Sequence, residues 1–391
     1  MTTSRRQFLS QSARLGVLLG AGVPILQACC GSSSGGSGKK TASIADGLKP
    51  EKGPLRIINY SDYVNPDVIT DFEAKYGVKV EISPIDTDTE ATTKLASGAI
   101  KADVHHSMAN TSIGNLINGG LLQPLNPSYL TNRGNVLTSL NDPWYDPGSK
   151  YSVPYTFFGT GIGYRADRID PDLVEQQGWD TIWNATDFKG QVSVLDDERE
   201  AFAMAMLRKD VKDINTLDTA VIDQALADVT ELIGLVNVKV NIEAYKDIPE
   251  GATTVAQTWS ADMISGAASH LPDGTSADVL GFWRPPSFRY LVTNDSMGVL
   301  ANAESPVLAH LYINHIIDND VAEKNFSSTG YLPALTKLDA TYVIKAGYVP
   351  ENLRSCVPTN EDISKGLSFK ALGPEGDALY EAAWSKFTAG G

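Results

Sequence analysis

Carboxylate and aromatic side chains stand next to one another at several places in the chain. The segment Tyr60-Ser61-Asp62-Tyr63 directly follows a short apolar run, and Asp196-Asp197-Glu198-Arg199-Glu200 follows another. Acids at such positions can cap a helix, because their oxygens accept hydrogen bonds from its first N–H groups. Capping explains one or two acids of the second segment, not all of them. Next to aromatic rings, the remaining acids can hold a cation through charge-assisted hydrogen bonds and cation–π contact.

Further candidates lie in the second half of the chain. Trp259 stands before a small polar pair, Asp295 in a polar segment, and Tyr331 directly after a glycine. Taken singly, each of these types is more often a core aromatic or a turn acid. Open α/β sheets bind ligands at the carboxyl ends of their strands. The position of Tyr60 to Tyr63, directly after a predicted strand, therefore favours a binding role.

Motif searches give no support for an enzyme, a cofactor or a metal. Residues 31–35 match the spacing of a nucleophile elbow, but they lie in a Gly/Ser-rich tether without the strand and helix that an elbow needs. Residues 159–163 have glycine spacing without the context of a dinucleotide site. Adjacent strand residues point to opposite faces, so His105 and His106 are a poor metal pair, and all five histidines are expected to have structural or surface roles.

Composition bounds the class of protein. A chain of 391 residues is expected to form two or three compact units, and its 42% hydrophobic and 20% charged content is ordinary for a soluble fold. The 32 basic residues face 47 acidic ones, a formal net charge of −15. Nucleic acids are excluded as partners, since their phosphates require a cationic surface.

The first residues read as an export signal. Arg5 and Arg6 precede an uncharged run that is too short to span a membrane, and the run ends in Leu26-Gln27-Ala28-Cys29. The pattern resembles a twin-arginine signal followed by a lipoprotein box, which implies cleavage after residue 28 and lipidation of Cys29. We therefore expect a signal peptide at 1–28, a lipidated Gly/Ser-rich tether at 29–53, and a body anchored to the outer face of the cytoplasmic membrane, on the periplasmic or extracellular side.

The body begins with a strand, a helix and a second strand. Residues 55–59 form a short apolar run, and residues 78–82 are predicted to be the second strand. Between them Asn65 and Pro66 begin a helix that Gly77 ends. This order predicts a crossover connection and an α/β layer fold. Further patterns predict strands at 192–195 and 236–240, helices at 201–208 and 219–235, and a helix that begins at Ser305-Pro306.

Four segments in order resemble the spermidine/putrescine-binding proteins of ABC importers. They are Asn59-Tyr60-Ser61-Asp62-Tyr63-Val64, Tyr151-Ser152-Val153-Pro154-Tyr155, Asp196-Asp197-Glu198-Arg199-Glu200 and Gly330-Tyr331. The resemblance covers roughly residues 54 to 391. It implies a two-lobed periplasmic-binding-protein fold of type II, in which each lobe is a mostly parallel sheet flanked by helices and a double crossover forms the hinge. Lobe 1 would comprise 54–160 plus 295–339 and lobe 2 would comprise 161–294 plus 340–391, with a glycine-rich hinge at 159–163.

The resemblance also implies the residues that bind the ligand. Tyr60 stands where the family usually has tryptophan, Asp197 and Glu200 match the acidic pair that holds the amines, and Thr293 replaces a tryptophan. The expected ligand-binding residues are Tyr60, Ser61, Asp62, Tyr63, Asp197, Glu200, Trp259, Asp295 and Tyr331, with Ser107 and Thr293 as weaker candidates.

The implied function is capture of a polyamine between the lobes by a monomer that delivers it to a membrane permease. Aromatic side chains would pack against the methylene groups of the ligand. Carboxylates would bind its ammonium groups and so select for their spacing. One alternative is the same receptor fold with another solute: a quaternary amine, an amino acid, a sugar or an iron complex. Another is a lipid-anchored hydrolase that uses Asp62 and Asp295 as an acid and a base.

Overall fold

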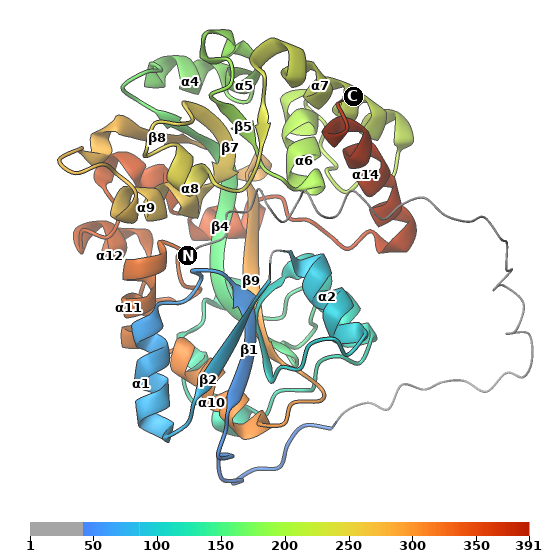
Figure 1. Cartoon of the computed structure of the whole chain (residues 1–391), viewed down its shortest axis with the longest axis vertical. Coiled ribbons are helices and arrows are strands. Elements are labelled where there is room, and N and C mark those ends of the chain that lie inside the picture. Colours follow the sequence, from blue (N-terminus) through green and yellow to red (C-terminus); the bar gives the residue numbers. More distant parts are fainter. Residues whose placement is uncertain (1–41, 86, 391) are drawn as a thin grey trace, which may run out of the picture. The chain divides into compact units, whose positions relative to one another are not determined.

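The computed structural model describes residues 42–85 and 87–390 (Figure 1). The expected signal peptide at 1–28, the lipidation site Cys29 and the tether as far as residue 41 lie outside the described residues. Within the described ranges, none of the helices combines the length and apolar character that crossing a bilayer requires.

A nine-stranded sheet runs through the described part of the chain in the order β2-β1-β3-β9-β4-β7-β5-β6, with β8 paired to β4. Its strands are β1 (Leu55–Tyr60), β2 (Val80–Ile85), β3 (Val104–Ala109), β4 (Ser152–Arg165), β5 (Val192–Val194), β6 (Lys239–Val240), β7 (Val255–Trp259), β8 (Leu280–Trp283) and β9 (Leu291–Val299). The strands β1, β2 and β3 are parallel, as are β5, β6 and β7.

Two long antiparallel strands, β4 and β9, join two lobes (Figure 1). They pair from Ser152 opposite Gly298 to Thr160 opposite Leu291. In the first lobe β9 continues the β1–β3 sheet by pairing with β3, and in the second lobe β4 pairs with β7 and β8. The prediction of a two-lobed α/β fold with a double crossover is confirmed.

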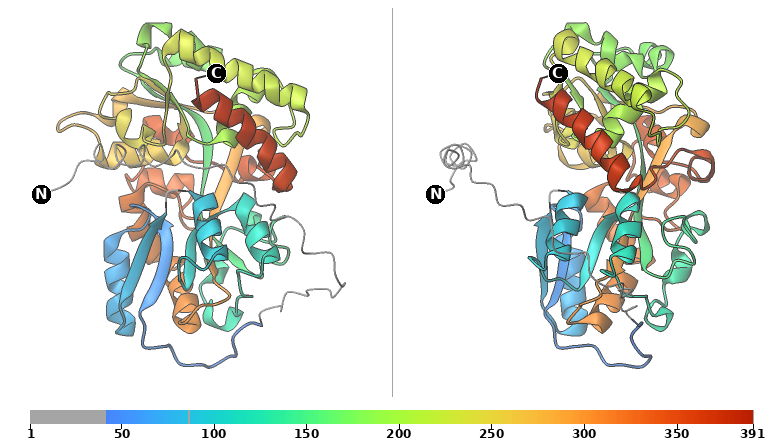
Figure 2. Two further views of the ribbon diagram at one scale, coloured as in Figure 1. Left: turned by 45° about the vertical axis from the view of Figure 1, so that its right-hand side comes forward. Right: turned by 90° about the vertical axis from the view of Figure 1, so that its right-hand side faces the viewer.

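Helices cover the faces of both halves of the sheet (Figures 1 and 2). They are α1 (Pro66–Tyr76), α2 (Asp88–Ala96), α3 (Asn110–Asn118), α4 (Pro171–Gln177), α5 (Asp180–Asn184), α6 (Glu198–Arg208), α7 (Thr219–Val236), α8 (Ala244–Asp247), α9 (Ser260–Ser269), α10 (Pro306–Ile316), α11 (Asn319–Thr329), α12 (Ala340–Lys345), α13 (Asn360–Lys365) and α14 (Gly373–Thr388). Apolar side chains fill one core on each face of the first half, around Ile57 and Ile58, and another in the second lobe around Phe202. In Figure 2 the C-terminal helix α14 lies in the second lobe, where it contacts α6 and α7.

The sequence predicted the ends of some helices and strands correctly and those of others less accurately. Helix α1 has the predicted caps, since the Asn65 side chain accepts a hydrogen bond from Asp67 N–H and Gly77 has φ 67°. Strand β2 begins at Val80, two residues later than predicted, and the predicted strand 236–240 was wrong at its start because Val236 ends α7.

The glycines of residues 159–163 make room for neighbouring groups. A Cβ on Gly159 would lie 2.2 Å from the Tyr290 ring, and one on Gly161 would lie 2.2 Å from the carbonyl oxygen of Trp283. Both glycines lie inside the buried strand β4. Close packing therefore accounts for these residues at the crossover, where the sequence suggested flexible backbone.

Residues 42–53, which the sequence analysis assigned to the tether, contact the first lobe. Glu51 accepts hydrogen bonds from the N–H groups of Val307 and Leu308 in the first turn of α10, and Tyr129 donates to Ala45 O. The carboxylate of Glu51 satisfies two of the backbone donors that every helix leaves free at its start. The segment of residues 42–53 is therefore attached to the first lobe ahead of the first strand.

Candidate ligand-binding site

The loop after β1 places two tyrosines at the crossover. Tyr63 is buried, and its hydroxyl donates to Asp295 Oδ2 at 2.8 Å and lies 2.6 Å from Thr156 Oγ1. Tyr60 is half-buried, with its ring centroid 5.9 Å from that of Tyr63. The structure therefore brings Tyr60, Tyr63 and Asp295 together.

The two residues between these tyrosines are exposed. Ser61 and Asp62 face solvent, and Asp62 has φ 57°, in the left-handed region that aspartate tolerates in tight turns. They belong to the same loop, but the described contacts do not bring them to Asp295.

The start of α6 supplies the acids of the second lobe. Asp197 is the N-cap, and its side chain accepts a hydrogen bond from Glu200 N–H at 2.9 Å. Glu200 is only 3% exposed, and its Oε1 accepts from Trp259 Nε1 at 3.0 Å and from Thr160 Oγ1 at 3.1 Å. Its Oε2 is buried and has no hydrogen-bond partner among the described residues. Asp197 thus has the capping role, and Glu200 carries an oxygen that is free to accept a donor.

Arg199, between these acids in sequence, forms no ion pair with either of them among the described residues. Its guanidinium lies over the rings of Phe369 and Tyr380, at 4.9 and 4.8 Å from their centroids, and donates to Asn215 Oδ1. These contacts hold the C-terminal segment against α6. No lysine or arginine of residues 42–85 and 87–390 forms an ion pair with Glu200, Asp262 or Asp295.

Aromatic rings form a continuous series of contacts between the lobes. Tyr63 meets Tyr331 edge-on at 4.7 Å between centroids, Tyr331 meets Phe158 at 5.6 Å, and Phe158 meets Trp259 at 5.9 Å. Such rings offer apolar area to methylene groups and negatively charged faces to cations.

Asp262, in the first turn of α9, is a site residue that sequence reasoning missed. It accepts hydrogen bonds from Tyr331 Oη at 2.8 Å and from Thr258 Oγ1 at 2.6 Å. Its position three residues after Trp259 was the available signal, but Tyr331 reaches it only through packing between distant segments.

The weaker candidates lie nearby. Thr293 is half-buried and opposite Phe158 in the pairing of β4 and β9. Ser107 is fully buried in the irregular part of β3, and its hydroxyl has no partner within the described residues.

Burial raises the pKa values of three acids in this cleft, Glu200, Asp295 and Asp262. The pKa of Glu200 rises to about 8, because burial disfavours its charge and Asp197 repels it. Burial raises the pKa of Asp295 to about 7 and that of Asp262 to about 6. Since burial without a cationic partner raises the free energy of a carboxylate, these acids favour a ligand that brings positive charge.

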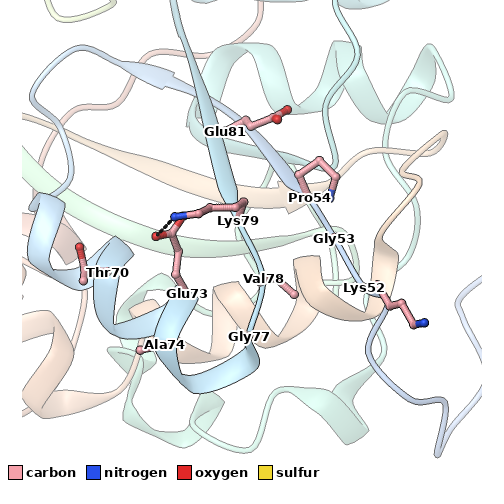
Figure 3. A pocket seen from close by; sticks show the side chains of 10 residues that line it. All are labelled: Lys52, Gly53, Pro54, Thr70, Glu73, Ala74, Gly77, Val78, Lys79 and Glu81. Atoms are coloured by element: carbon pink, nitrogen blue, oxygen red, sulfur yellow. Dashed lines mark hydrogen bonds and ion pairs between the residues drawn. The ribbon is translucent and has the colours of Figure 1, made fainter.

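A separate surface pocket lies at the other end of the first sheet (Figure 3). Its lining residues are Lys52, Gly53, Pro54, Thr70, Glu73, Ala74, Gly77, Val78, Lys79 and Glu81. Pro54 and Lys79 stand at the starts of β1 and β2, whereas Tyr60 stands at the carboxyl end of β1. The pocket is therefore not part of the acidic and aromatic cleft.

Comparison with known families decides the class of protein. The model of the bacterial extracellular solute-binding proteins matches residues 67–348. The chain belongs to this family.

This solute-binding protein has curated relatives at modest identity. It is 28% identical over 338 residues to the spermidine/putrescine-binding periplasmic protein of Salmonella typhimurium, covering 86% of this chain and 92% of that one. It is 27% identical over 360 residues to the putrescine-binding periplasmic protein PotF of Escherichia coli, covering 88% and 93%.

Solved structures confirm the fold of this solute-binding protein. A putative spermidine/putrescine ABC transporter protein from Listeria monocytogenes superposes with a TM-score of 0.72 at 21% identity, covering 85% of this chain and 98% of that one. The TpPotD lipoprotein of Treponema pallidum superposes with a TM-score of 0.71 at 21% identity over the same shares.

Proposed function

We propose that this solute-binding protein captures a polyamine, such as spermidine or putrescine, between its lobes and delivers it to the permease of an ABC importer. The observation that carries the proposal is the pair of buried carboxylates from opposite lobes, Glu200 and Asp295, which lack a cationic partner within the described residues. The names of the two curated relatives support the same ligand class.

The chemistry of the cleft suits a flexible chain of methylenes with ammonium groups. Each charge-assisted hydrogen bond contributes about 1.5–3 kcal/mol, and each cation–π contact contributes about 0.5–2 kcal/mol. Two or three of each would support micromolar or tighter binding after the cost of ordering the ligand. Tyr60, Tyr63, Trp259 and Tyr331 would form the walls.

The lobes are proposed to be 54–160 plus 295–339 and 161–294 plus 340–391, with residues 42–53 resting on the first. Closure around the ligand would present one rigid surface to the permease, and one protein monomer would hold one ligand. Ser61 and Asp62 would join the site on closure, and Ser107 and Thr293 would remain at its edge.

Calorimetric titration of the purified protein tests this function. Spermidine, putrescine and spermine form one set of ligands, and amino acids, glycine betaine and a sugar form the control set. Saturable one-to-one binding of a polyamine supports the proposal. If a control solute gives binding heat and the polyamines give none, the protein is still a solute receptor but its ligand is not a polyamine.

A non-enzymatic role is part of this proposal. A hydrolase would need its acid and base on either side of a substrate bond. Asp62 is exposed, whereas Asp295 is buried and bonded to Tyr63. Incubating the protein with glycosides and esters should give no turnover above that of the Asp295→Asn variant.

Export and anchoring are proposed from the N-terminal pattern. Arg5 and Arg6 would direct the folded protein to the twin-arginine pathway, and Cys29 would carry the lipid. Metabolic labelling with a palmitate analogue should mark the protein and should fail to mark Cys29→Ala, while replacing both arginines by lysine should leave the precursor inside the cell.

A further inference from the structure

One buried acid near the cleft is not among the proposed ligand-binding residues. Asp88 begins α2, directly after the carboxyl end of β2, and its side chain is 12% exposed. Both of its carboxylate oxygens are buried and lack a hydrogen-bond partner among the described residues. The N-cap of α2 is already provided by the Thr87 side chain, which accepts from Glu90 N–H. Capping therefore does not explain why this acid is buried.

Asp88 lies at the same sheet edge as the site. Ile85 at the end of β2 is paired with Tyr60 at the end of β1, so the residues that follow both strands share this edge. Burial, followed by the charges of Asp88, Asp295 and Asp197, raises the pKa of Tyr60 well above its ordinary value. The phenol thus lies within the electrostatic range of acids from α2, β9 and the start of α6.

A fully buried histidine adjoins this acid without satisfying it. His105 Nε2 lies 3.5 Å from Asp88 Oδ1, close enough for an ion pair if the imidazole is protonated, but no hydrogen bond joins the two side chains, and both ring nitrogens lack hydrogen-bond partners in the part of the chain that the structure describes. His105 itself is 0% exposed. Buried polar groups are normally paired, so an unpaired set that includes a carboxylate indicates a missing donor.

Three carboxylates at the cleft therefore have an oxygen ready to accept a donor. Glu200 has Oε2 free, Asp88 has both oxygens free, and Asp295 has only Oδ2 in a hydrogen bond with Tyr63. Asp262 differs, because hydroxyl groups already donate to both of its oxygens. With Asp197 engaged as the N-cap of α6, these three carboxylates match three ammonium groups at one each.

We infer that Asp88 is a further ligand-binding carboxylate and that the cleft takes an organic cation with three ammonium groups in preference to one with two. This inference rests on the proposed function and adds to it a residue and a charge count. The third ammonium group binds Asp88 beside Tyr60, while the others bind Glu200 and Asp295. A diamine leaves one of these acids without a cation.

The test compares Asp88→Asn with the unmodified protein by calorimetry, using spermidine as the triamine and putrescine as the diamine. Removing one charge-assisted bond should weaken spermidine binding about tenfold or more. Putrescine binding should change by less than about threefold, because the other acids hold its two charges. Asp172→Asn, at an exposed acid on α4, controls for the loss of one negative charge.

Ligand-free melting separates binding from structure. If Asp88 serves the ligand, Asp88→Asn melts at the same temperature as the unmodified protein or higher, since an uncompensated buried charge is lost. His105→Gln, which keeps the carboxylate, should retain the affinity for spermidine. A lower melting temperature for both variants with an unchanged spermidine-to-putrescine ratio would overturn the inference and make the pair structural. Absence of polyamine binding by the unmodified protein would overturn the proposed function itself.

Discussion

Glu200 and Asp295 both make the stability of the ligand-free protein depend on pH. Folding removes both carboxylates from water and raises their pKa values to about 8 and about 7, from ordinary values of 4.5 and 3.8. The folded state therefore holds these protons at pH values where the unfolded chain has released them. Stability in the absence of ligand falls as the pH rises from about 4 to about 8, because ionisation in the fold becomes progressively costly relative to the unfolded chain.

Ligand binding should consequently release protons near neutral pH. An ammonium group beside each carboxylate favours its ionised form, so at pH 7 part of the population of Glu200 and Asp295 must deprotonate on binding. Calorimetry in buffers of different ionisation enthalpy should show net proton release, and the affinity for spermidine should increase between pH 6 and pH 8. An affinity independent of pH over this range would contradict the assignment of these acids to the ligand.

Neutral replacements of the same acids should weaken binding strongly. Glu200→Gln and Asp295→Asn each remove one charge-assisted hydrogen bond, so each should reduce the affinity by about 1.5–3 kcal/mol, or roughly tenfold to more than a hundredfold. Titration calorimetry with spermidine measures the loss. Retention of affinity in both variants would refute the site, and their unchanged far-ultraviolet circular dichroism would show that the fold is intact.

Strand β4 contributes to the fold through close packing of its glycines. Gly161→Ala would place a methyl group 2.2 Å from the backbone of Trp283, so β4 and β8 would have to separate. We expect a loss of about 1–3 kcal/mol in the free energy of unfolding, measured by urea denaturation. Gly114→Ala is the matched control, because a Cβ on Gly114 in α3 would have nothing within 4 Å, and alanine there should stabilise the helix by about 0.5–1 kcal/mol. Equal effects of the two changes would contradict the packing role.

Elements whose signals are local were predictable from the sequence. Asn65 and Pro66 determine the start of helix α1 and Gly77 determines its end, and each acts through local backbone geometry or a hydrogen bond to a nearby residue. Strand β2 was placed two residues early, since an apolar residue in the preceding loop, Val78, packs into the core without pairing. The close packing of the β4 glycines could not be predicted, because their neighbours Tyr290 and Trp283 are far away in the sequence.

The candidate site also contains residues that the sequence could predict and residues that it could not. Glu200 could be proposed from sequence because the resemblance preserves its spacing from Asp197, and Trp259 because a small polar pair follows it as in the family. The structure joins Glu200 and Trp259 by a hydrogen bond. Asp262 could not, since its significance depends on Tyr331, 69 residues away. The same holds for Asp88, whose neighbour His105 lies on another strand.

The two lobes are in contact beside the cleft even without a ligand. Tyr331 follows α11 of the first lobe, and its hydroxyl donates to Asp262 on α9 of the second. The preceding residue is also close to α9, since a Cβ on Gly330 would lie 2.5 Å from Ser265 N. This contact stabilises the approach of the lobes and is strongest when Asp262 is ionised.

Removing the Tyr331 hydroxyl should therefore open the ligand-free protein. In Tyr331→Phe, loss of a hydrogen bond to a charged acceptor costs about 1.5–3 kcal/mol, enough to lower the closed population about tenfold or more. Small-angle scattering should show a larger radius of gyration without ligand, and saturating spermidine should restore the compact value. An unchanged radius in the ligand-free variant would show that other contacts hold the lobes together. Tyr129→Phe is the control, because the Tyr129 hydroxyl donates to Ala45 O and not to a group of the other lobe.

The segment that precedes the first strand determines where mechanical load enters the protein. Glu51 holds this segment to the start of α10, and Tyr129 holds Ala45, so tension applied to the chain ahead of residue 42 is transmitted to the first lobe. That attachment lies near the start of β1, whereas the cleft lies at its carboxyl end. If the chain is anchored ahead of residue 42, as proposed above, the first lobe is the one that is held, and the second lobe can move relative to it about β4 and β9.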